Sequence, residues 1–264
     1  GGHVRYIRIL ATLFPGRKFF LHLRIVEDIS KERLAKIPEN LSLVTISDYM
    51  QNLLIRNGYT GIMVNDTYPF KETSKSFANT ELHPSVSVIG RFTVTKGSKN
   101  VLQFFQYLSD NSRTPFTLNI FGNVDNSAET QSIVSDLRSL KGTDVVFHGF
   151  IDDPDVIYSQ SRMIIHFNQH EPLGRIFFEA IDYQIPFIGF NSGGIKEIAA
   201  NCGLSEFMVE PGEHWEDQMY QVLKKVLSVP EEISEKLKKA KETASGVYSL
   251  ESYTRLLDTL LYGK

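Results

Sequence analysis

Residues 171–180, EPLGRIFFEA, place two carboxylates around the expected start of a helix. The first N–H groups of a helix have no partner within it, so they favour an anion. Here those groups belong to Gly174, Arg175 and Ile176. Glu171 comes just before the helix, and Glu179 lies five residues into it, about 7.5 Å from the helix start at about 1.5 Å per residue. Since a phosphate repels carboxylates, we expect both to bind hydroxyl groups, such as those of the two sugars that flank the diphosphate of a nucleotide-sugar. An equal alternative is a solvated Glu171 and a Glu179 that only favours the helix.

Two further segments follow expected strands and lead into helices. IGRFTVTKG contains Gly90, Arg91 and Lys96, and two cations beside a helix start suit a phosphate or diphosphate. FNSGGIKE contains Gly193 and Gly194, which let the backbone lie close to a ligand and whose amides can add to an anion site. Each pattern has an ordinary alternative: two solvated charges in the first segment, and a common turn in the second.

Short apolar segments alternate with helical ones through most of the chain. Strands are expected at 85–90, 116–122, 144–150, 162–167, 186–190 and 206–209. Helices are expected between them at 99–110, 128–140, 154–160, 174–183 and 194–200, and again from His214 onwards. This alternation predicts an α/β fold with a Rossmann-like parallel sheet and helices on both faces. Ligands of such sheets bind outside the carboxyl ends of the strands, where the three segments lie.

The part before about residue 80 has a different pattern. Strands are expected at 17–25, 41–46 and 60–64, and a helix at 47–58 between a Ser47 cap and Gly58. Residues 65–84 are polar and indicate a linker. The predicted domains are therefore a short partial α/β lobe over 1–75, a nucleotide-sugar-binding domain over 80–248, and a C-terminal helix over 249–264 that packs back on the first lobe. About three strands fall short of the five or six of a complete mononucleotide-binding fold.

Taken together and in order, these motifs resemble glycosyltransferase family 4, whose members have the GT-B fold. The matching residues are Gly90, Arg91, Lys96 and Gly97, then Glu171, Gly174, Glu179 and Ala180, then QIPFIGFNSGGIKE. VVFHGFI at 145–151 matches a further strand of the family. The resemblance covers residues 41–200. The glycine-rich loop of the family's N-terminal domain is absent, so the first lobe is expected to be an incomplete N-terminal domain.

The resemblance implies transfer of a sugar from a nucleotide-diphosphate-sugar to an acceptor, with retention of configuration and without a metal or other cofactor. By the same resemblance, Arg91 and Lys96 bind the diphosphate and stabilise the charge on the leaving group. Glu171 orients the donor sugar, Glu179 holds the ribose hydroxyls, and the base lies near residues 145–151. Gly90, Gly174, Arg175, Ile176, Gly193 and Gly194 complete the donor site.

Two positions depart from the family pattern or match it weakly. Arg175 replaces an apolar residue, and it either adds a cation to the diphosphate site or points to solvent. His22 is the candidate for a histidine that the N-terminal domain brings towards the donor sugar; the alternative is a half-buried strand histidine. Because the first lobe is short, the other candidate functions are a nucleotide-sugar-binding subunit or truncated fragment that is inactive on its own, and a sugar-nucleotide epimerase on the same fold.

Composition excludes several classes of site. The chain has 264 residues, 42% hydrophobic and 22% charged, which is typical of a soluble protein. Its net charge of −3 gives no argument for nucleic acid, and its single cysteine, Cys202, excludes a disulfide framework and a cysteine-rich zinc site. The motif of Asp153, Pro154 and Asp155 resembles a metal-binding pair, but we expect Asp153 to be a helix cap. No metal site is predicted.

The N-terminal segment is basic and amphipathic. Arg5, Arg8, Arg17, Lys18 and Arg24 precede the first acid, Glu27, and they alternate with Val4, Ile7, Leu10, Leu13 and Phe14. Such a segment can lie on an anionic membrane surface, although an ordinary helix packed on its own domain shows the same periodicity. The arginines interrupt what would be the core of a signal peptide, and no apolar run reaches the roughly 20 residues of a membrane span. We expect a cytoplasmic protein, with peripheral membrane contact as a further hypothesis and with a glycan, lipid or small molecule as acceptor.

Overall fold

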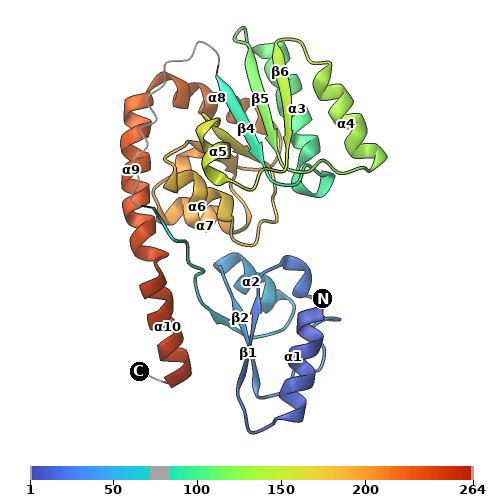
Figure 1. Cartoon of the computed structure of the whole chain (residues 1–264), viewed down its shortest axis with the longest axis vertical. Coiled ribbons are helices and arrows are strands. Elements are labelled where there is room, and N and C mark those ends of the chain that lie inside the picture. Colours follow the sequence, from blue (N-terminus) through green and yellow to red (C-terminus); the bar gives the residue numbers. More distant parts are fainter. Residues whose placement is uncertain (1, 72–83, 263–264) are drawn as a thin grey trace.

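The computed structural model of the chain describes residues 2–71 and 84–262. Within these ranges the chain forms two lobes, each built on a parallel sheet (Figure 1). We call residues 2–64 the first lobe, residues 65–71 the crossover and residues 84–247 the second lobe. Beyond residue 249 follows a helix, α10 (Leu250–Tyr262), that runs from the second lobe down past the first.

The first lobe is a three-stranded sheet in the order β1-β2-β3. Its strands are β1 (Phe19–Leu23), β2 (Leu41–Thr45) and β3 (Ile62–Met63). Its helices are α1 (Gly2–Leu13), a short 3₁₀ turn η1 (Val26–Asp28) and α2 (Asp48–Arg56). The predicted Ser47 cap is confirmed, because its hydroxyl accepts a hydrogen bond from the N–H of Met50 at 3.2 Å. Gly58 follows the helix with a φ of 85°, as expected for a C-terminal stop.

The second lobe has a six-stranded sheet in the order β6-β5-β4-β7-β8-β9, and every pair is parallel. Its strands are β4 (Ser85–Ile89), β5 (Phe116–Phe121), β6 (Thr143–Gly149), β7 (Ile164–His166), β8 (Phe187–Phe190) and β9 (Met208–Val209). Its helices are η2 (Val94–Lys96), α3 (Ser98–Asn111), α4 (Ala128–Arg138), α5 (Pro154–Ser159), α6 (Arg175–Asp182), α7 (Gly193–Asn201), η3 (Ser205–Phe207), α8 (Trp215–Ser228) and α9 (Pro230–Val247). The order reverses between β4 and β7, so the connections after these two strands leave in opposite directions and a crevice opens between them.

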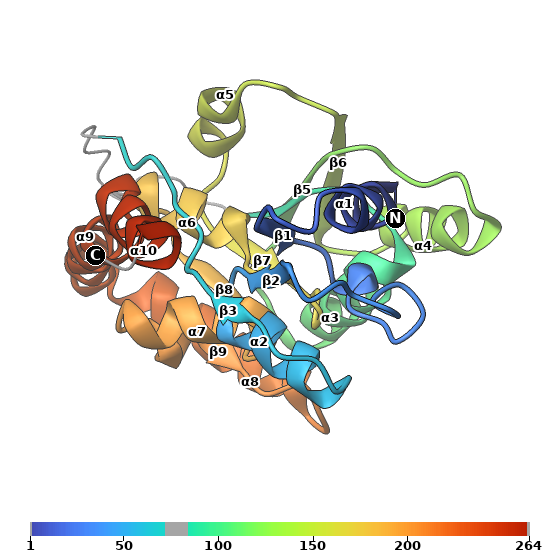
Figure 2. The ribbon, with the colours of Figure 1, turned by 90° about the horizontal axis from the view of Figure 1, so that it is seen from below.

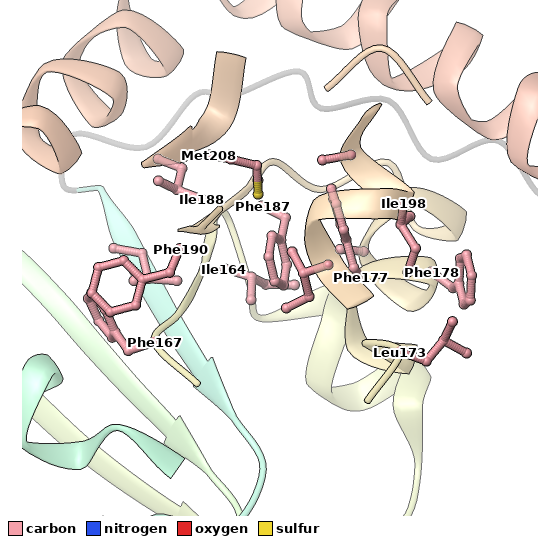
Figure 3. Close-up of a cluster of buried hydrophobic side chains, with 14 of the residues drawn as sticks. Ile164, Phe167, Leu173, Phe177, Phe178, Phe187, Ile188, Phe190, Ile198 and Met208 are labelled. Atoms are coloured by element: carbon pink, nitrogen blue, oxygen red, sulfur yellow. The ribbon is translucent and has the colours of Figure 1, made fainter. Parts of the chain in front are cut away.

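The strands β5, β7, β8 and β9 of the second lobe are largely buried, as their continuous apolar sequences indicate, whereas the edge strand β6 exposes Asp144 and Val146. Figure 3 shows the core where α6 meets the sheet, with the ring of Phe177 beside that of Phe187 on β8. The two rings stack with centroids 4.4 Å apart, and both side chains are fully buried. Each such burial contributes about 1.5–3 kcal/mol. The core therefore holds α6, and with it the segment that carries both glutamates, in a fixed position against the sheet.

The crossover is held firmly, although the sequence indicates a linker there. Tyr68 and Phe70 contact Phe178 of α6, and the N–H of Tyr68 donates to the carbonyl of Tyr248 at 3.1 Å. Residues 72–83, the rest of the predicted linker, lie outside the described residues. Figure 2 shows α10 next to the crossover. Consistent with this, burial and then the negative charge of Asp66 raise the pKa of Tyr253 on α10.

Candidate active site

A cavity of about 310 Å³ opens between the lobes, over the point where the strand order reverses. The second lobe contributes the segments that follow β4 and β7 and the start of α6. The first lobe contributes Arg24, Ile46 and Asp66. Of the predicted site residues, Gly90, Arg91, Lys96, Glu171, Gly174, Arg175 and Ile176 line this cavity. Residues from three separate sequence motifs are thus brought together.

The turn after β4 carries the two predicted cations. Gly90 has a φ of 121°, which favours glycine, and Arg91 follows it as an exposed residue that borders the cavity. Lys96 ends the short helix η2, and Gly97 follows with a φ of 91°. A Cβ at Gly97 would lie 2.8 Å from Cβ of Phe167, so only glycine lets this turn approach the end of β7. That close approach brings Lys96 towards the loop after β7.

Glu171 is surrounded by groups that favour its ionised form. Lys96 Nζ lies 3.1 Å from its Oε2, Asn168 Nδ2 donates to the same oxygen at 2.5 Å, and His166 Nε2 lies 3.7 Å away. Burial alone would raise its pKa, but the neighbouring His166, the Lys96 charge and the Asn168 amide outweigh burial and hold the pKa of Glu171 at about 2. At neutral pH the cavity therefore contains a fixed carboxylate beside a fixed ammonium group.

The start of α6 forms one wall of the cavity. Gly174 is the N-cap with a φ of 101°, and a Cβ there would lie 2.6 Å from Cγ1 of Ile195. Both the positive φ and the lack of space for a Cβ require glycine at position 174. Arg175 is exposed and borders the cavity, so its side chain adds a further positive charge to this wall. Together with the helix N-terminus, the three cations make the cavity suited to a polyanion.

The glycine pair supports the loop that carries Glu171. The N–H of Gly194 donates to the carbonyl of Glu171 at 2.8 Å, and a Cβ at Gly194 would lie 2.5 Å from Cα of Leu173. A Cβ at Gly193 would lie 2.6 Å from the carbonyl oxygen of Glu171. Neither glycine is among the described residues that line the cavity. The contribution of the amides of this pair to an anion site stays a prediction; in the structure the Gly194 amide donates to the carbonyl of Glu171.

Glu179 lies one turn deeper, outside the described lining of the cavity. Its Oε2 accepts a hydrogen bond from Tyr158 Oη at 2.6 Å. Tyr158 is buried and stacks on Tyr183 with centroids 4.5 Å apart. The second glutamate is thus oriented by a tyrosine from α5. Its predicted contact with ribose hydroxyls stays a prediction.

His22 lies on β1 and is not among the described residues that line the cavity. Its pKa is lowered, first by burial and then by the charge of Arg24. Arg24, two residues further on, does line the cavity, and its guanidinium holds Asp66 through two hydrogen bonds, one of them 3.2 Å long. The first lobe therefore presents an arginine–aspartate pair to the cavity, and the role of His22 stays a prediction.

A sequence model of the family "Glycosyl transferases group 1" matches residues 70–244. The chain belongs to this family. A search of the curated proteins found no match. Among solved structures, HepE of Anabaena in complex with UDP and glucose is 16% identical, with a TM-score of 0.75 over 96% of this chain and 74% of its own. Sucrose-phosphate synthase from Thermosynechococcus elongatus is 19% identical, with a TM-score of 0.73 over 92% and 67%. A glycosyltransferase from Rickettsia africae is 17% identical, with a TM-score of 0.73 over 97% and 74%.

These similarities confirm the predicted GT-B type of fold for the glycosyltransferase. The finer assignment to family 4 stays a prediction. In the part of the chain that the structure describes, no group of three or more His, Cys, Asp and Glu side chains could hold a metal ion. Asp153 caps α5 by accepting from the N–H of Asp155 at 2.9 Å, which confirms its predicted role as a cap. None of the described helices is long and apolar enough to cross a bilayer.

Proposed function

We propose that this glycosyltransferase moves a hexose from a nucleotide-diphosphate-sugar to an acceptor, with retention of configuration and without a metal, as a member of glycosyltransferase family 4. The observation that carries the proposal is the ion pair between Lys96 and Glu171 beside the start of α6. It places Glu171, which can accept from sugar hydroxyls, and Lys96, which can bind a diphosphate, in one cavity. The proposal rests further on the family to which the chain belongs.

Cleavage of the bond between the sugar and the diphosphate leaves negative charge on the departing oxygen. Arg91, Lys96 and the first N–H groups of α6 stabilise that charge. Lys96, paired with Glu171, and the helix amides are held before reaction and need little reorganisation. Lys96 has three N–H donors, so it can bind a phosphate oxygen while it still holds Glu171. These positive groups supply the compensation that a metal ion would otherwise provide.

Glu171 orients the donor sugar. Because its pKa is held at about 2, it is an acceptor for hydroxyl groups over the whole physiological range. Lys96 and Asn168 hold its Oε2 and leave acceptor capacity on the carboxylate for the sugar. Glu179, oriented by Tyr158, holds the ribose, and the base lies near the end of β6, around Gly149.

Among the possible nucleotides, uridine diphosphate is the one that we propose for the donor. HepE is described with UDP, with UDP and glucose, and with UDP-glucose, and it shares the fold at 16–17% identity. Uridine donors are therefore the first to test, followed by guanosine and adenosine donors. The alternative, a nucleotide-sugar-binding subunit or fragment without turnover, is favoured by the three-stranded sheet of the first lobe.

A panel of UDP-, GDP- and ADP-hexoses decides between these functions. We expect one donor to be consumed, with products of retained configuration by NMR and with equal rates before and after dialysis against EDTA. Glu171→Gln should keep the fold and lose most of the turnover. A donor that binds but is never consumed would leave only the binding-subunit function. Release of an isomerised nucleotide-sugar without an acceptor would indicate an epimerase, and the absence of any binding would overturn the proposal.

We also propose that the protein is cytoplasmic and that α1 contacts the anionic inner face of a membrane. Val4 and Ala11 are buried against the first lobe. The other side of the helix is apolar and exposed, namely Tyr6, Ile9, Leu10 and Leu13, followed by Phe14. Arg5, Arg17 and Lys18 are exposed around it and complement anionic headgroups. Vesicles of anionic lipid should therefore sediment the protein, vesicles of neutral lipid should not, and replacement of Leu13 and Phe14 by serine should abolish binding.

A further inference from the structure

The N-terminus of α2 contacts the loop that carries Glu171, although the two belong to different lobes. We call residues 168–173 the glutamate loop. Ser47 Oγ donates to the carbonyl of Pro172 at 2.5 Å, and Ser47 is fully buried. The same oxygen accepts from the N–H of Met50 at 3.2 Å. One hydroxyl thus caps the start of α2 in the first lobe and also bonds to the carbonyl of the residue after Glu171.

The two residues after Ser47 extend this contact. The N–H of Asp48 donates to Glu197 Oε2 at 2.7 Å, so a carboxylate of the second lobe satisfies one of the open amides of α2. Tyr49 Oη lies 3.3 Å from Nδ1 of His170 in the glutamate loop. Three consecutive residues of the first lobe therefore hold the loop and α7 at the same time.

The glutamate loop has little freedom on its opposite side. Gly194 of α7 bonds to the carbonyl of Glu171, and the backbone of residues 171–173 lies directly on the glycine pair. Pro172 has a fixed φ, which removes one of the two backbone rotations between its carbonyl and the adjacent Glu171 and so couples their positions more closely. The loop is enclosed between α7 of its own lobe and α2 of the other.

We propose that Ser47 is a positioning residue: its hydroxyl fixes the glutamate loop, and with it the Glu171 carboxylate, when the first lobe is docked on the second. This inference rests on the proposed function of Glu171. A misplacement of about 1 Å can reduce the rate of an oriented reaction about 10²-fold, so the loss of one such hydrogen bond has a measurable effect. The protein groups proposed to bind the diphosphate all belong to the second lobe, so the affinity for the nucleotide should not depend on Ser47.

The two roles of the Ser47 hydroxyl can be separated by substitution. Aspartate is as good an N-cap as serine and accepts from the N–H of Met50, but when ionised it has no proton to donate to Pro172. Ser47→Thr keeps both roles. Ser127, the cap of α4, is a matched control, because it accepts from the N–H of Thr130 and donates to Thr130 Oγ1 at 3.0 Å within one lobe.

We expect Ser47→Asp to lower kcat about 10-fold or more while the Kd for UDP changes less than about 2-fold, and Ser47→Thr to restore kcat. Ser127→Asp should leave kcat unchanged. Hydrogen exchange gives a second readout that needs no turnover: the Gly194 amide should lose protection in Ser47→Asp and keep it in Ser127→Asp. The inference would be overturned if Ser47→Asp had the kcat of the wild type and also the wild-type protection of the Gly194 amide. If Ser47→Asp does not fold, Ser47→Ala takes the same two measurements, and wild-type values there overturn it equally. A wild-type protein without turnover contradicts the proposed function, whereas an unchanged exchange pattern contradicts only the role of Ser47.

Discussion

Lys96 and Glu171 form a 3.1 Å ion pair across the point where the strand order of the second lobe reverses. Lys96 lies in the connection after β4 and Glu171 in the connection after β7, and these strands are neighbours in the sheet although 75 residues separate the two side chains. Neither residue is fully exposed, so each holds the other in place before a ligand arrives. The pair is therefore preorganised for a ligand that carries both hydroxyl groups and negative charge.

Removal of the Lys96 charge should reduce turnover strongly. We expect Lys96→Ala to lower kcat about 10²-fold, because the leaving diphosphate loses one of its fixed cations. Lys99→Ala is the control, since Lys99 forms an exposed ion pair with Glu129 and is not among the described residues of the cavity. Steady-state kinetics with the accepted donor gives both values. Equal kcat values in the two variants would contradict the role of Lys96 in stabilising the leaving diphosphate.

The pKa of Glu171 predicts an acid dependence of stability. The folded-state pKa of about 2 is below the ordinary value of 4.5, so the unfolded chain binds more protons between these values. The resulting stabilisation is present above pH 4.5 and is lost as the pH falls through about 2. Its size is on the order of 3 kcal/mol. Urea unfolding from pH 6 down to pH 3 should show wild type and Glu171→Gln converging, and curves that stay parallel would contradict the assignment.

Glu197 predicts the opposite trend near neutral pH. Its pKa is about 7, because burial and the Asp48 charge, which raise it, outweigh the hydrogen bond from the Asp48 N–H, which lowers it. The folded chain then holds a proton that the unfolded chain has lost, so this contribution to stability is present below pH 4.5 and is lost as the pH rises through about 7. Glu197→Gln should remove the dependence and be more stable than wild type at pH 8 by about 1–2 kcal/mol. Glu235→Gln, at an exposed i,i+4 pair, should follow the wild-type curve.

Much of the second lobe could be predicted from the sequence, because its strands are continuous apolar runs and glycines mark the turns that follow β4 and precede α6. The Ser47 cap also has a local signature, and it is confirmed. Strand order has no such signature, because nothing local indicates that β4 lies beside β7. The roles of Lys96 and Glu171 at one donor site came from the family resemblance, and their ion pair was not predicted. Partners from distant segments, such as Tyr158 for Glu179, have no sequence signal at all. Arg24 was missed because the expected strand 17–25 extended past the true end of β1 at Leu23, which hid an arginine that follows a strand end.

The hydrogen bond from Tyr158 to Glu179 should matter for the nucleotide. Tyr158→Phe keeps the ring that stacks on Tyr183 but removes the Oη that orients the carboxylate. A hydrogen bond to a charged group contributes about 1.5–3 kcal/mol, so we expect the Kd for UDP to rise about 10-fold or more, with a small loss of stability. Tyr107→Phe removes an exposed hydrogen bond to Asp217 and is the control. Calorimetric titration measures the Kd for UDP of both variants. Equal affinity in Tyr158→Phe and Tyr107→Phe would contradict the proposed contact between Glu179 and the ribose.

Asp182 connects the crossover to the second lobe, and its loss should destabilise the chain. Its carboxylate is buried, accepts from the Lys71 N–H at 2.9 Å and lies 2.9 Å from Lys241 Nζ, whose side chain is largely buried as well. Disruption of a buried ion pair costs about 3–5 kcal/mol, and we expect Asp182→Asn to lower the free energy of unfolding by about 3 kcal/mol. Asp155→Asn is the matched control, because Asp155 also contacts Lys71 but is exposed, so its ion pair should contribute less than about 1 kcal/mol. Urea unfolding at pH 7 compares the two variants; equal midpoints would mean that the crossover is held by Tyr68 and Phe70 rather than by Asp182.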